Sequence, residues 1–84
     1  LVGKVIFEVK GRFRSLDEAR KYIFFRASNP DYRLIFVFCN RDVRMPGAKK
    51  RKDGTYRTIE EWAHTEGFEY TFENECSNWI KENL

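Results

Sequence analysis

Residues 32–39 form a nearly unbroken run of apolar, largely aromatic and β-branched side chains, interrupted only by Arg33. A strand with one face in water alternates apolar and polar residues, whereas a strand covered on both faces does not. The run therefore predicts a central strand that is covered on both faces. This prediction constrains the fold more than any other part of the sequence.

The residues before this run predict a strand and then a helix. Two sets of side chains alternate along residues 4–10, with Val5, Phe7 and Val9 on one face and Lys4, Ile6, Glu8 and Lys10 on the other. This is the two-residue period of a strand with one polar face. A capping box, Ser15-Leu16-Asp17-Glu18, predicts a helix over 16–28 that ends where Asn29 takes a left-handed turn and Pro30 follows.

A strand, a helix and a buried strand in succession make a βαβ unit, whose two strands are parallel. We therefore expect an α/β fold in which a mixed or parallel sheet is flanked by helices. A chain of 84 residues can bury one compact core, so residues 1–84 are interpreted as a single domain or part of one.

The second half of the chain is predicted to contain a loop and shorter elements. Residues 40–57 include Pro46-Gly47, Asp53-Gly54 and four consecutive basic residues, with few apolar residues to bury. This composition predicts an exposed, mobile, basic loop. A second capping box at Thr58 predicts a helix over about 59–66 closed by Gly67, and 68–72 and the residues from 77 onward predict an edge strand and a last helical turn.

Charge is distributed unevenly along the chain. Residues 1–40 carry eight basic and four acidic side chains, residues 41–57 seven and two, and residues 58–84 one and seven. Clusters of Lys and Arg displace counterions from a phosphate backbone, so the first two thirds of the chain are suited to a polyanion partner. The candidate phosphate contacts are Arg12, Arg41, Arg44, Lys49, Lys50, Arg51, Lys52 and Arg57. A solubilising basic loop is the alternative interpretation.

Glu8 and Lys10 are the residues best suited to chemistry. They are two apart on a predicted strand, so a carboxylate and an ammonium project from the same face. The carboxylate can bind Mg²⁺ or Mn²⁺, the metal can activate water, and the lysine can orient that water or offset negative charge, which suits phosphodiester hydrolysis. The carbonyl of Val9 is a further candidate ligand. The E-x-K pattern alone also fits an ordinary solvated strand face with ion pairs.

The positions of cysteine and histidine and the hydropathy of the chain argue against a structural zinc protein and a membrane protein. Cys39, Cys76 and His64 lack the paired spacing of a structural zinc site, and the two cysteines are interpreted as reduced. His64 is interpreted as a surface residue, not a base. No apolar run approaches the length of a membrane span, and no signal segment is present, so we expect a cytoplasmic protein. The absence of Met at position 1 suggests a portion of a longer protein.

Several stretches in order resemble the phage endonuclease I family of four-way-junction resolvases, within the PD-(D/E)xK nuclease superfamily. They are E-V-K-G at 8–11, S-L-D-E at 15–18, N-P at 29–30, the apolar run, the basic loop, T-I-E-E-W-A-H-T-E-G at 58–67 and W-I-K-E at 79–82. The similarity extends from about Ile6 to Glu82. Only the E-x-K-G stretch carries catalytic information.

The resemblance implies a restriction-endonuclease-like core in which Glu8 binds the metal, Lys10 is the catalytic lysine and Val9 offers its carbonyl. It also implies an Asp and a further Glu of the site that would precede Leu1, and an intertwined homodimer that exchanges an N-terminal segment. The basic loop is longer than in the family. The expected function is a structure-selective endodeoxyribonuclease that cuts branched DNA with Mg²⁺ or Mn²⁺, in the host cytoplasm if phage-encoded. A non-catalytic nucleic-acid-binding module and another PD-(D/E)xK repair or restriction nuclease are the alternatives.

Overall fold

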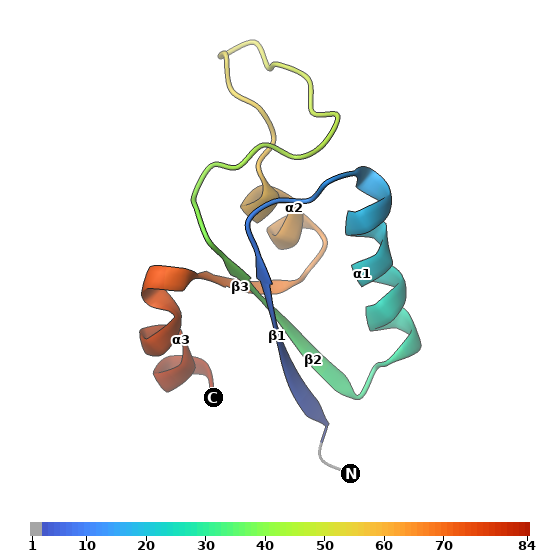
Figure 1. Ribbon diagram of the computed structural model, residues 1–84, viewed down its shortest axis with the longest axis vertical. Helices are drawn as coiled ribbons and strands as arrows, with labels where there is room; N and C mark the ends of the chain where they lie inside the picture. Colours follow the sequence, from blue (N-terminus) through green and yellow to red (C-terminus); the bar gives the residue numbers. More distant parts are fainter. Residues whose placement is uncertain (1–2) are drawn as a thin grey trace.

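The computed structural model describes residues 3–84 and shows a small α/β domain (Figure 1). Its elements in chain order are β1 (Lys4–Lys10), α1 (Leu16–Ser28), β2 (Tyr32–Phe38), α2 (Ile59–Thr65), β3 (Glu69–Phe72), the short 3-10 turn η1 (Glu73–Glu75) and α3 (Cys76–Asn83). The predicted βαβ unit is therefore confirmed, as are the helix over 16–28 and the edge strand near the end of the chain.

The described strands form one sheet in the order β1-β2-β3. Both neighbouring pairs are parallel, and Glu8 and Lys10 of β1 lie beside Phe36 and Phe38 of β2. Of the two predicted alternatives, a mixed or a parallel sheet, the described strands form the parallel one. Helices α1 and α2 each connect one strand to the next and return the chain in the same direction.

Most of the predicted capping chemistry is observed at the helix ends. The Ser15 hydroxyl accepts a hydrogen bond from the Glu18 N–H, and Thr58 and Glu61 form a complete reciprocal capping box. Gly67, at φ 77°, closes α2 in the left-handed region as predicted. Asn29 does not take the predicted left-handed conformation, because its φ is −132°. It ends α1 by donating hydrogen bonds from its backbone N–H and its side-chain amide to the Phe25 carbonyl.

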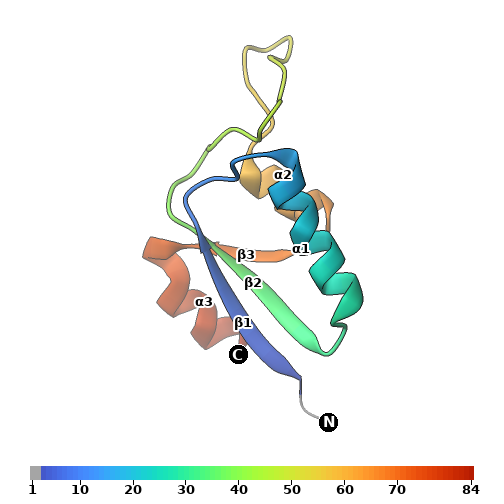
Figure 2. The same ribbon diagram turned by 45° about the vertical axis from the view of Figure 1, so that its right-hand side comes forward.

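The main core lies between the sheet and helices α1 and α2. Phe36 is fully buried, and its ring contacts those of Tyr22 on α1 at 5.0 Å and Trp62 on α2 at 5.9 Å between centroids. On the opposite face, Trp79 of α3 meets Phe7 edge to face at 6.4 Å. Figures 1 and 2 show α1 and α3 on opposite sides of the sheet.

Burial of the strands agrees with prediction for β2 and differs from it for β1. Residues 34–38 are all buried, whereas Tyr32 and Arg33 are half-buried and Cys39 is exposed beyond the strand end. In β1 the apolar side chains are the exposed ones, with Val5, Phe7 and Val9 at 44%, 38% and 61% of full exposure. The polar face of β1 therefore packs toward α1, and its apolar face is only partly covered by α3.

Residues 41–57, here called the basic arm, project beyond the carboxyl ends of the strands (Figure 1). The arm has more internal structure than predicted. Met45 is 3% exposed and belongs to the core, and its N–H donates to the Arg57 carbonyl at 2.8 Å. Asp53 accepts hydrogen bonds from the backbone N–H and the hydroxyl of Thr55 at the turn. The arm is thus a hairpin-like excursion anchored by a buried methionine.

Arg33 ties the second and third strands to the last helix. Its Nε and Nη2 donate to the two carboxylate oxygens of Glu69 at 2.7 and 2.6 Å, and its Nη1 donates to the Asn83 carbonyl at 3.2 Å. The hydrogen bond from Arg33 is the main reason that the pKa of Glu69 is lowered.

The Glu69→Gln variant should lose stability at neutral pH but not in acid. Because the folded-state pKa of Glu69 is depressed, its contribution is present above the ordinary carboxyl pKa and is lost as pH falls through the folded value. Both side chains are 40% exposed, so we expect a loss of at most about 1 kcal/mol near neutrality. Thermal unfolding of both proteins at about pH 7 and about pH 3 measures it. The exposed Glu82→Gln serves as control, and a deficit of equal size at both pH values would contradict the prediction.

Candidate active site

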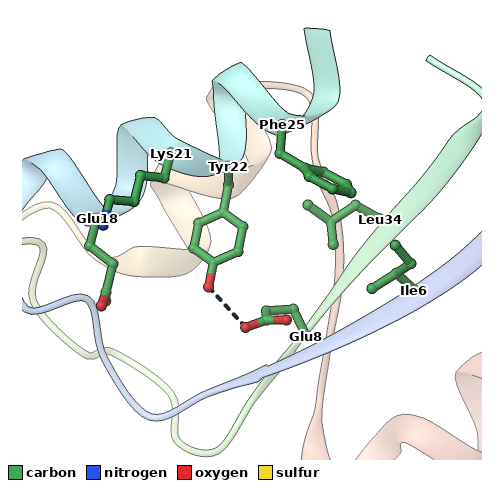
Figure 3. A pocket seen from close by; sticks show the side chains of 7 residues that line it. All are labelled: Ile6, Glu8, Glu18, Lys21, Tyr22, Phe25 and Leu34. Atoms are coloured by element: carbon green, nitrogen blue, oxygen red, sulfur yellow. Dashed lines mark hydrogen bonds between the residues drawn. The ribbon is translucent and has the colours of Figure 1, made fainter. Parts of the chain in front are cut away.

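Glu8 and Lys10 lie on the same face of β1, as their spacing predicts, and both are half-buried against α1. The Tyr22 hydroxyl donates a hydrogen bond to Glu8 Oε1 at 2.9 Å (Figure 3). Lys10 Nζ lies 3.7 Å from Glu18 Oε1, with the two side chains 19% and 25% exposed. Helix α1 thus supplies one partner to each member of the E-x-K pair.

Sequence reasoning did not assign Tyr22 or Glu18 to this site. Tyr22 falls at helical spacing with the apolar residues Ala19 and Ile23, which indicates only a core position, and Glu18 is the second half of the predicted capping box. The Glu18 carboxylate accepts instead from the Arg14 N–H at 3.1 Å and lies near Lys10, and within residues 3–84 it makes no reciprocal bond to the Ser15 N–H. The four-residue spacing of Glu18 and Tyr22, which places them on one helix face, was the available signal.

The pKa shifts agree with this network. The interaction with the Tyr22 hydroxyl is the largest cause that raises the pKa of Lys10, and Glu18 and Glu8 add to it. Burial is the main cause that raises the pKa of Tyr22. The Arg14 N–H, followed by Lys10, lowers the pKa of Glu18. At neutral pH the site therefore holds a charged ammonium and a protonated phenol.

The Val9 carbonyl points to the open edge of the sheet. The Cys39 N–H donates to the Lys10 carbonyl at 3.0 Å, which fixes the Lys10 carbonyl on the β2 side. Backbone groups of successive strand residues point to opposite sides, so the Val9 carbonyl is directed away from β2. Within residues 3–84 no strand pairs with that edge. The carbonyl is therefore available as a ligand.

Glu8 and the Val9 carbonyl have the right chemistry for a hard cation but are few in number. Both are oxygen donors of the kind that Mg²⁺ and Mn²⁺ prefer. No group of three or more His, Cys, Asp or Glu side chains within residues 3–84 is placed to hold a metal ion. Further oxygen ligands would have to come from the substrate or from residues outside this range.

A pocket of about 460 Å³ adjoins Glu8 on the α1 side of the sheet (Figure 3). It is lined by Ile6, Glu8, Glu18, Lys21, Tyr22, Phe25 and Leu34. One wall is apolar, and the other carries the carboxylates and the phenol. Glu8 therefore borders open space and is not sealed in the core.

The eight predicted phosphate contacts divide into two groups. Arg41 pairs with Glu75 and lies over the Phe72 ring at 3.9 Å, and Arg51 pairs with Glu61 at 2.6 Å. Arg44 lies over the Tyr56 ring at 4.7 Å. The remaining cations make no side-chain hydrogen bond or ion pair with residues 3–84; they are Arg12, Lys49, Lys50, Lys52 and Arg57. The cations free to bind phosphate therefore come mainly from the second half of the arm.

A second pocket, of about 470 Å³, lies between the β1–α1 turn and the base of the basic arm. Three arginines line it, Arg12, Arg14 and Arg44, together with Phe13, Val43, Met45, Pro46, Gly47 and Ala48. Arg14 was not among the predicted phosphate contacts, and only the folded structure brings it close to the arm. This arginine-lined groove begins two residues after Lys10 along the chain.

Cys39 and Cys76 are free thiols, and His64 is exposed on α2. No helix within residues 3–84 is long and apolar enough to cross a membrane. Comparisons of the chain with models of protein families, with curated proteins and with solved structures find no match.

Proposed function

We propose that the chain carries the E-x-K half of the catalytic centre of a structure-selective endodeoxyribonuclease with a restriction-endonuclease-like core. Its reaction is the hydrolysis of phosphodiester bonds in branched DNA, such as a four-way junction, with Mg²⁺ or Mn²⁺. The observation that carries the proposal is that Glu8 and Lys10 share one half-buried strand face while the carbonyl between them is directed to the open edge. The resemblance of the E-V-K-G stretch to the endonuclease I family supports it.

Each residue of the pair has a distinct role. The Glu8 carboxylate and the Val9 carbonyl would hold the cation, which when bound supplies positive charge to the phosphate and makes water a better nucleophile. Lys10 carries a charged ammonium at neutral pH, as an unperturbed lysine does, and its neighbours raise its pKa further. It offsets the negative charge that develops on the phosphate oxygens.

The protein contacts the phosphate backbone of DNA and does not recognise its base sequence. The arginine-lined groove and the unpaired cations of the arm offer contacts to phosphate, and phosphate contacts position a duplex without reading its bases. Arg41 and Arg51 contribute less, since each already has a carboxylate partner. Recognition in this proposal depends on the shape of the junction.

Neutralising four unpaired cations of the arm should reduce the salt dependence of junction binding. In a Lys49→Gln, Lys50→Gln, Lys52→Gln and Arg57→Gln variant, the log-log slope should fall by about 0.9 for each phosphate contact that is lost. Fluorescence anisotropy over a range of salt concentrations measures the slope. A variant with Arg20→Gln and Lys81→Gln, on α1 and α3, should keep the slope of the unmodified protein. An unchanged slope in the fourfold variant would exclude the arm from DNA binding.

We extend the proposal to a homodimer with exchange of an N-terminal segment, in which two sites cut two strands of one junction. The exposed side chains of Val5, Phe7 and Val9 support it, because a contiguous apolar face of this kind is normally covered by protein. Size-exclusion chromatography with light scattering measures the oligomeric state directly.

A non-catalytic nucleic-acid-binding module is the second candidate. The observation in its favour is that Glu8 and Lys10 are each engaged with a side chain of α1, as in an ordinary structural network. The basic arm would serve this function equally well. Cleavage, and not binding, separates the two candidates.

The experiment that tests the nuclease proposal compares a four-way junction with a linear duplex of matched sequence. The chain is used together with any residues that its natural reading frame places before Leu1, and the cation is Mn²⁺. We expect nicks near the branch point of the junction and none in the duplex. Equal cutting of both DNAs would point to another PD-(D/E)xK nuclease, and binding without cutting would point to the binding module.

A further inference from the structure

Tyr22 lies where it can act on both members of the E-x-K pair. Its hydroxyl donates to Glu8 Oε1 at 2.9 Å, and its interaction with the Lys10 ammonium is the largest cause that raises the pKa of Lys10. The ammonium is 5.3 Å from the centroid of the Tyr22 ring. The hydroxyl thus donates to the carboxylate, and the ammonium lies beside the same ring.

The position of this hydroxyl is fixed by the core. The Tyr22 ring packs against Phe36 at 5.0 Å and against Phe13 at 5.9 Å, and both of those rings are buried. Tyr22 also lies in the middle of α1, a helix of 13 residues. A ring held on several sides has few alternative rotamers, so the hydroxyl at its end is held in place.

The hydrogen bond from Tyr22 engages one side of the Glu8 carboxylate. The donor is the Tyr22 hydroxyl, and the acceptor is Oε1 at 2.9 Å. Only one of the two Glu8 oxygens is occupied in this way, and Oε2 has no hydrogen-bond partner within residues 3–84.

We propose that Tyr22 is a positioning residue, whose hydroxyl holds Glu8 Oε1 and thereby presents Oε2 to a divalent cation. The inference rests on the proposed nuclease function and adds a residue to it. Groups that orient a metal ligand commonly change metal affinity or activity by about 10- to 100-fold when they are removed. A role in packing alone would require only the ring.

The Tyr22→Phe variant removes the hydroxyl and keeps the ring. The half-saturating Mn²⁺ concentration for junction cleavage should rise about 10-fold. Junction affinity without metal should stay unchanged, because the hydroxyl does not contact DNA in this proposal. Phe25→Leu, which changes another α1 residue of the same pocket, should keep the Mn²⁺ dependence of the unmodified protein.

A titration without metal or DNA tests the hydroxyl directly. The pKa of Tyr22 is obtained from the absorbance difference between each protein and the same protein carrying Tyr22→Phe. Glu8→Gln should lower this pKa, since the carboxylate raises it, and Lys10→Met should raise it, since the ammonium lowers it. If Glu8→Gln does not move the Tyr22 pKa, the hydroxyl does not hold the carboxylate, and the proposal is overturned.

The two assays together separate the possible failures. If the unmodified protein cuts the junction and Tyr22→Phe has the same Mn²⁺ dependence, the positioning role is wrong and the nuclease proposal stands. A rate lowered equally at every Mn²⁺ concentration would show a structural role and would also overturn the inference. If the unmodified protein does not cut, the nuclease proposal fails and the role of Tyr22 fails with it.

A fluorinated tyrosine at position 22 keeps the test valid if Tyr22→Phe folds poorly. Fluorine lowers the pKa of the phenol, so the donor is lost within the pH range of the assay. The half-saturating Mn²⁺ concentration should then rise with pH in the fluorinated protein and not in the unmodified one. Identical pH dependence in the two proteins would contradict the positioning role.

Discussion

Lys10→Ala should lower the rate of junction cleavage by about 10²- to 10³-fold, the effect typical of removing one preorganised group that stabilises developing negative charge. The reason is local, since Lys10 is the cation nearest to Glu8 on the same strand face and its pKa is raised. Binding of the junction should weaken much less, because only one of many cations is lost. Single-turnover cleavage and metal-free binding assays measure the two effects separately.

Lys4→Ala is the matched control for Lys10. Lys4 lies on the same face of β1, six residues earlier, and its side chain is exposed near the Tyr32 ring. The Lys4→Ala substitution removes the same charge from the same strand and leaves the surroundings of Glu8 unchanged. A cleavage rate in Lys4→Ala as low as that in Lys10→Ala would show that strand charge, and not the pairing with Glu8, accounts for the loss.

Phe36→Ala should unfold much of the protein or leave it only marginally stable. Phe36 is fully buried, and its ring meets aromatic rings from both helices of its face and from β2. Deleting a buried phenylalanine side chain costs about 3–5 kcal/mol. A chain of 84 residues has a total free energy of unfolding of only about 4–13 kcal/mol. Urea denaturation followed by circular dichroism measures the loss.

Phe24→Ala provides the comparison for Phe36. The Phe24 side chain is 70% exposed on α1, so its removal should change the free energy of unfolding by no more than about 0.5 kcal/mol. If the two substitutions destabilise the chain equally, then the core does not lie between the sheet and helices α1 and α2.

Local sequence rules predicted the secondary structure well because the relevant interactions are local. The Ser15 cap and the helical spacing after it gave the bounds of α1, and the left-handed Gly67 ended α2 as predicted. The apolar run of residues 34–38 is buried on both faces. Asn29 departed from prediction because its side chain can cap α1 without entering the left-handed region.

The partners within the candidate site required the fold itself. The spacing of Glu8 and Lys10 placed them on one face, but it did not show that this face packs on α1 and that Val5, Phe7 and Val9 are the exposed set. Tyr22 has an apolar body and a polar tip, so helical spacing identified it only as a core residue. Its hydroxyl donates a hydrogen bond to Glu8, which lies 14 residues earlier in the sequence, and helical spacing does not predict a contact over that distance.

The ordered structure of the basic arm could not be predicted from its composition either. Its Gly, Pro and Lys content is typical of a loop, and the single Met45 carried no periodic pattern that predicts burial. The pairing of Arg51 with Glu61 joins the arm to α2, so the number of free cations could not be counted from sequence. Arg14 joined the candidate phosphate contacts for the same reason.

The most direct measurement is the Mn²⁺-dependent cleavage of a four-way junction by the unmodified protein and by Glu8→Ala, each with any residues that precede Leu1 in the natural reading frame. Binding of both proteins to the same junction is measured without metal. The account predicts that only the unmodified protein cuts and that both bind with similar affinity. Equal cleavage by both proteins, or binding with no cleavage by either, would contradict the assignment of Glu8 to a catalytic centre.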